Sequence, residues 1–149
     1  MIAVDDFHRN PSETMDRGFV VINSDQDASA IRLADIIAAL ATGNYFAAGR
    51  VSTAHPAPPR FTDITVDGHT ITVKTDKETD IEFITGRCNY YKEGPKYAHK
   101  DGGVTSAQYT ASFDDQYVRI KAIYMENGRE SYAWSNPIYC EPAPIADSR

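Results

Sequence analysis

The sequence contains few cysteines and no long apolar segment. Of its 149 residues only two are cysteines, Cys88 and Cys140, and their separation fits neither a zinc ribbon nor a disulfide framework. Two buried thiols are the simplest interpretation. No apolar run approaches the length of a membrane span, and Asp5 and Asp6 lie where a signal peptide would carry positive charge. We therefore expect a soluble protein, located in the cytoplasm.

Positive charge is also scarce and dispersed. The chain has 15 lysines and arginines against 21 aspartates and glutamates, which gives a formal net charge of −6. Without a basic block, neither nucleic acid nor a membrane surface is an expected partner. The sequence also lacks a glycine-rich phosphate loop, a Gly-x-Ser-x-Gly motif and a His-Glu-x-x-His motif. It therefore contains no complete catalytic constellation.

The first third of the chain has the pattern of a short α/β segment. Apolar runs predict strands at residues 2–4 and 18–22. Isoleucines, leucines and alanines then recur with helical spacing and predict an amphipathic helix over residues 28–42. Asp27 or Ser29 would cap its start, and the following Gly-Asn pair would end it.

The remainder predicts an antiparallel β-sandwich of the immunoglobulin-like kind. A Pro-rich linker at residues 55–59 is followed by short runs of alternating apolar residues with turn residues between them. The runs are residues 61–66, 70–74, 81–85, 107–113, 117–124 and 132–139. Asp67-Gly68 and Asn127-Gly128 are hairpin turn signals. The predicted fold class is therefore mainly β, with a short α/β segment and one helix in front.

Aromatic residues in the sandwich could serve the core or a ligand. Trp134, the only tryptophan, has the position of a core anchor between sheets. Tyr90, Tyr91 and Tyr97 share one polar segment and are the candidate ligand-binding residues, although loop tyrosines usually pack on the sheet below them. Stacking of a sugar would require several aromatic residues on one face.

Asp6-Phe7-His8 is the sharpest chemical signal. Alternate residues of an extended segment point the same way, so Asp6 and His8 can face one cation. A carboxylate and an imidazole suit zinc, manganese or iron. The alternative is a solvated N-terminal loop without a ligand.

Four stretches in this order resemble the C-terminal part of a metal-dependent hydrolase of the polymerase-and-histidinol-phosphatase (PHP) superfamily. The matching stretches are residues 4–8, with Asp-x-His; 18–22, the next strand; 36–46, with Ala-Leu-x-x-Gly-x-Tyr/Phe; and 117–138, with Tyr-Val-Arg-Ile and Ala-Trp-Ser-Asn-Pro-Ile. The resemblance implies that the chain is divided into three parts. Residues 1–50 would be the last units of a catalytic barrel, 51–140 a β-sandwich domain and 141–149 a flexible tail.

The resemblance also implies a function and leaves an alternative open. Asp6 and His8 would be the last metal ligands of a phosphoesterase or amidohydrolase barrel, whose other ligands lie upstream. The chain would then be an accessory domain without activity alone, binding a divalent metal only as part of a complete barrel. Its partner would be the upstream barrel polypeptide, or a second copy in a homodimer. The alternative is a free-standing β-sandwich module that binds a carbohydrate or a protein.

Overall fold

The computed structural model describes residues 17–24, 26–87, 97–112 and 114–140, apart from the side chains of residues 87 and 97–102. Within these ranges the chain forms eight strands and one helix, so the predicted mainly-β fold is confirmed. The elements are β1 (Gly18–Ile22), α1 (Leu33–Thr42), β2 (Tyr45–Arg50), β3 (Phe61–Asp67), β4 (Thr70–Arg87), β5 (Tyr97–Thr110), β6 (Asp115–Glu126), β7 (Arg129–Trp134) and β8 (Ile138–Tyr139).

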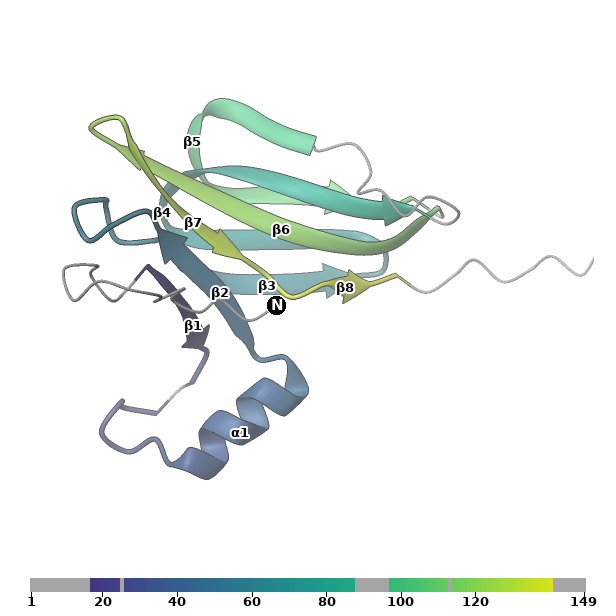
Figure 1. Cartoon of the computed structure of the whole chain (residues 1–149). Helices are drawn as coiled ribbons and strands as arrows, with labels where there is room; N and C mark the ends of the chain where they lie inside the picture. The colour runs from purple at the N-terminus through teal and green to yellow at the C-terminus, as the bar shows by residue number, and fades with distance from the viewer. Residues whose placement is uncertain (1–16, 25, 88–96, 113, 141–149) are drawn as a thin grey trace, which may run out of the picture.

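All strand pairs are antiparallel, and they form one continuous sheet (Figure 1). Its order is β1-β2-β7-β6-β4-β3, with β5 also paired to β4 and β8 paired to β6. β1 and β2 therefore join the sheet through β7, which lies far away in the sequence. The domain boundary predicted near residue 50 stays a prediction.

The long strand β4 belongs to two parts of the sheet. Residues 70–74 pair with both β3 and β5, whereas residues 80–87 pair with β6. The pairing with β5 shifts register around Thr79, between these two parts. Irregular pairing of this kind bends a strand. The sheet consequently folds over at β4, and both parts contribute to one core.

Alternation along the strands places the core side chains. Ile71, Val73, Ile81 and Phe83 occupy alternate positions of β4, and each is at most 1% exposed. On β6 the buried apolar residues are Val118, Ile120 and Ala122, whose alternate positions place them on one face. We call the side of the sheet opposite these residues the outer face.

A hairpin turn is present at both predicted places, but between β3 and β4 its two loop residues are Gly68 and His69, because Asp67 pairs with Thr70. Asn127 and Gly128 have φ values of 51° and 72°, as a two-residue turn with both residues left-handed requires. Gly68, between β3 and β4, has a φ of 56°. The register of both hairpins thus follows directly from local sequence.

The helix is shorter than predicted. Its N-cap is Arg32, not Asp27 or Ser29, because the Asp35 carboxylate accepts a hydrogen bond from the Arg32 backbone N–H at 2.9 Å. Residues 28–30 form a turn instead. The predicted end is correct: Gly43 has a φ of 76°, and the next amide bonds back to the Ala39 carbonyl.

Candidate functional site

The site residues predicted from sequence lie mostly outside the described part of the chain. Asp6, His8, Tyr90 and Tyr91 belong to segments that the structure does not describe. The backbone of Tyr97 pairs with Phe83 at the start of β5, but its side chain is not described. The structure therefore does not test whether these residues bind a metal or a ligand.

Among the described residues, no group of three histidine, cysteine, aspartate or glutamate side chains could hold a metal ion. Two of the described histidines, His55 and His69, belong to connections, whereas His99 lies in β5, where only its backbone is described. A ring nitrogen of His55, Nδ1, lies 2.9 Å from the Glu130 carbonyl oxygen, and His69 is in the β3–β4 turn. Within the described ranges, no helix has the length and apolar character needed to cross a bilayer.

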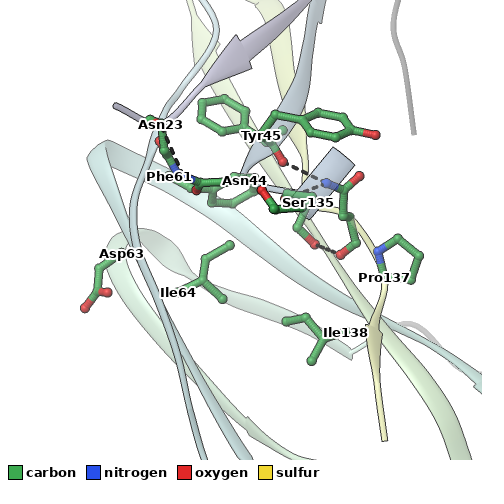
Figure 2. A pocket seen from close by; sticks show the side chains of 13 residues that line it. Asn23, Asn44, Tyr45, Phe61, Asp63, Ile64, Ser135, Pro137 and Ile138 are labelled. Carbon is green, nitrogen blue, oxygen red and sulfur yellow. Dashed lines mark hydrogen bonds between the residues drawn. The ribbon is translucent and has the colours of Figure 1, made fainter. Parts of the chain in front are cut away.

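A cleft of about 310 Å³ opens where the end of α1 meets β3 and the connection between β7 and β8 (Figure 2). Asn136 forms one wall: its Nδ2 donates to the carbonyls of Gly43 at 2.9 Å and Tyr45 at 3.0 Å. Ser135 Oγ donates to the Asn136 carbonyl at 2.8 Å. These polar groups join distant parts of the chain.

The chemistry of the cleft is limited. Asp63 is the one ionisable side chain other than tyrosine among its lining residues, and its carboxylate lies 3.4 Å from Lys74 Nζ. Phe61 and Ile64 supply apolar surface. A single paired carboxylate provides neither a nucleophile with its base nor a pair of acid and base groups. The volume of the cleft lies at the lower end of the range for ligand pockets, and its described residues do not form a catalytic set.

A second polar cluster closes the turn between β5 and β6. Asp115 is 3% exposed, and its Oδ2 accepts hydrogen bonds from the Tyr109 hydroxyl at 2.8 Å and the Ser112 backbone N–H at 2.9 Å. Cys140 is half-buried nearby, and burial, followed by the negative charge of Asp115, raises the pKa of its thiol. A thiol with a raised pKa is a poor nucleophile at neutral pH, so this cluster is structural.

The outer face of the sheet carries most of the described tyrosines and the only tryptophan. Strand pairing places their side chains on one side: Trp134 is opposite Ala47 and Lys121, Tyr117 is opposite Tyr139, and Tyr132 is opposite Gly49. We call this set the aromatic face. Its members are Tyr45, Tyr117, Tyr132, Trp134 and Tyr139.

The prediction that Trp134 anchors the core was wrong. Its neighbours Ala133 and Ser135 point into the core at 0% and 4% exposure, so Trp134 points outward and is half-buried. Its ring stacks on Tyr132, with centroids 5.4 Å apart and planes inclined by 25°. The alternation of small and aromatic residues at positions 131–135 is the sequence signal that could have placed Trp134 on this face.

Charged groups surround the stacked rings. Lys121 Nζ lies 5.0 Å from the centroid of the Tyr132 ring and 3.9 Å from Glu82 Oε2. The Tyr132 hydroxyl donates to Glu130, and this hydrogen bond, followed by burial, raises the pKa of Tyr132. The tyrosine is therefore neutral at physiological pH.

A glycine on a neighbouring strand makes room for one of the rings: an added Cβ at Gly86 would lie 2.1 Å from the Tyr117 ring. A Cβ at Gly49 would lie in ordinary van der Waals contact with the Trp134 ring, at 3.6 Å. Each ring therefore lies over a glycine of an adjacent strand. Such cross-strand pairs hold aromatic residues against a sheet.

Comparisons of the sequence with protein families and curated proteins, and of the structure with solved structures, found no match. No relative therefore supplies a function or a family. The resemblance to the PHP superfamily stays a prediction, and the function must be inferred from the surfaces described above.

Proposed function

We propose that this chain is an accessory β-domain that docks through α1 onto the catalytic barrel of a PHP-type metal-dependent hydrolase. The observation that supports this function is an apolar stripe on α1. Leu33, Ile37 and Leu40 are 72%, 57% and 39% exposed. Residues spaced by three and four positions lie along one side of a helix.

The stripe is not needed for packing within the described part of the chain. The helix buries Ala39, at 8% exposure, and half-buries Ile36 on its other side. Burying a leucine or isoleucine side chain contributes about 1.5–3 kcal/mol. Three such residues exposed in one row are typical of an interface. A barrel with an outer layer of helices offers the complementary apolar surface.

In the assembled enzyme, Asp6 and His8 would complete a site for zinc, manganese or iron, which would supply an activated water for hydrolysis of a phosphoester or amide. Carboxylate and imidazole are suitable ligands for these metals. Two ligands alone cannot fix the geometry of a cation. The remaining ligands would therefore come from the barrel, and α1 would dock this chain onto it.

Light scattering and hydrolase assays test this function. A coding region directly upstream that encodes a His-x-His barrel would supply the partner polypeptide. We expect the chain alone to show no turnover of p-nitrophenyl phosphate or of simple amides, and to form a complex with that polypeptide. Ile37→Asp should abolish the complex, whereas Val66→Asp, which changes a similarly exposed residue of β3, should not.

Two outcomes would contradict the proposal. Chelator-sensitive turnover by the chain alone, lost in His8→Ala, would make it an enzyme in its own right. A homodimer that Ile37→Asp dissociates would identify a second copy as the occupant of the α1 stripe. Absence of metal from the purified chain is compatible with the proposal, since two ligands alone bind a metal ion weakly.

The alternative function, a free-standing module that binds a carbohydrate or a protein, is favoured by a different observation. The aromatic face gathers five ring side chains on one side of the sheet, which is the arrangement that sugar stacking requires.

A further inference from the structure

The two faces of the sheet differ in their aromatic residues, although Tyr109 packs against the core. The described phenylalanines lie in the core or against it: Phe46, Phe61 and Phe83 are at most 3% exposed, and Phe19 packs beside them. The outer face instead carries tyrosines and the tryptophan. Rings that combine apolar area with a polar group suit a surface that contacts a polar ligand.

We propose that the aromatic face is a saccharide-binding site centred on Trp134 and Tyr132, which rests on the alternative function given above. The C–H groups on one side of a sugar ring carry partial positive charge, and the faces of aromatic rings are negative. A pyranose ring can therefore stack on an indole or a phenol. The mutual stacking of Trp134 and Tyr132 holds both rings in place before a ligand arrives.

Polar groups beside the rings fit a ligand rich in hydroxyls. Lys121 is a donor, and its Nζ lies 3.9 Å from Oε2 of Glu82, a buried oxygen that accepts no hydrogen bond. Their side chains are 21% and 18% exposed. Hydroxyl groups are acceptors as well as donors, so they can accept hydrogen bonds from the Lys121 ammonium.

The same charges disfavour the other classes of ligand. An apolar protein surface placed over Glu82 and Lys121 would remove their remaining water without replacing its hydrogen bonds. Nucleic acid also stacks on aromatic rings, but it requires a positively charged groove, and this chain carries a net charge of −6. A neutral saccharide can replace the lost hydrogen bonds with its hydroxyl groups, and it does not require a positively charged groove.

Fluorescence provides a direct test, because Trp134 is the only tryptophan in the chain. Cellohexaose, chitohexaose and xylohexaose, each titrated to millimolar concentration, serve as probes. We expect at least one of them to shift the emission saturably. Affinity electrophoresis in gels containing xylan or mixed-linkage β-glucan should show retarded migration of the native chain.

Variants locate the site. Tyr132→Ala should weaken binding at least about tenfold, and Trp134→Ala should abolish retardation in the gel. Tyr124→Ala is the matched control, since Tyr124 pairs with Ser131, whose side chain is in the core, and so points away from the aromatic face. It should bind as the native chain does. Circular dichroism melts confirm that each variant is folded.

The proposal is overturned if no probe changes the emission or the migration, or if Trp134→Ala and Tyr132→Ala bind as well as the native chain. Loss of binding in Tyr124→Ala to the same extent would also overturn it. Ile37→Asp should leave sugar binding intact, so that failure of this site and failure of docking through α1 are separate results.

Discussion

At the scale of single residues, the structure depends on a few positions at which a substitution would disturb the neighbouring side chains or backbone. Gly86 leaves space for the Tyr117 ring, and Asp115 holds the turn that precedes β6. The sequence did not reveal either role. A glycine in a strand indicates close approach of some other group, but only strand pairing identifies which one.

Gly86→Ala should destabilise the fold by about 1–3 kcal/mol, the usual range for overpacking. The added methyl group would overlap the Tyr117 ring, which must then leave its place. A double-mutant cycle with Tyr117→Ala, measured by urea unfolding, checks this cause. If Gly86→Ala costs as much in the Tyr117→Ala background, then the ring is not responsible.

Cys140 should react slowly with iodoacetamide. Its thiol pKa is raised, so the folded chain favours the protonated form up to a higher pH than the unfolded chain does. The corresponding contribution to stability is present at neutral pH and is lost as the pH rises through the raised pKa. Alkylation rates against pH, in a Cys88→Ser background, should show a midpoint above that of the same chain in urea. Equal midpoints would mean that the fold does not shift the thiol.

At the scale of elements, local pattern predicted most strands, and tertiary pairing decided the others. The alternation in β3 and β6 and the turn at Asn127-Gly128 were readable because each is encoded within a few residues. β2 was missed because its small residues, Ala47 to Gly49, lack the β-branched side chains that are typical of strands. The runs at 70–74 and 81–85 were predicted as two strands, since the polar residues between them conceal the bend of β4.

Substitutions on helix α1 test which of its faces packs against the rest of the folded chain. Ile37→Asp should change the melting temperature by only a small amount, because Ile37 is 57% exposed. Ala39→Asp should lower it markedly, since a buried carboxylate has no partner there. Thermal melts followed by circular dichroism make the comparison. Equal losses in both variants would show that the Ile37 side is also packed within the folded chain.

At the scale of the whole molecule, the two faces of the sheet have different roles. The core face supplies stability, and the outer face supplies the proposed contact surface. The sequence could predict the mainly-β class, but not the cleft at the end of α1. That cleft is built by Asn136 bonding to Gly43, residues 93 positions apart. No local pattern encodes such a contact.

Phe83→Ala should therefore cost about 3–5 kcal/mol, the range for emptying a buried aromatic site. Phe83 is fully buried and stacks on Tyr109 at a centroid distance of 5.4 Å. Trp134→Ala should cost clearly less, because Trp134 is half-buried and lies outside the core. Urea unfolding of the two variants ranks them. The opposite order would place the main apolar stabilisation on the outer face.

Because β4 pairs with strands in both parts of the sheet, neither part can open without breaking hydrogen bonds of the same strand. Amide hydrogen exchange should consequently be slowest near Ile81 and Phe83, and exchange there should require global unfolding rather than local opening. Folding should also be slow for a chain of this size, since the joint between β2 and β7 closes a long loop. Because the bent strand β4 links both parts of the sheet, we expect the two parts to fold and unfold together as one cooperative unit.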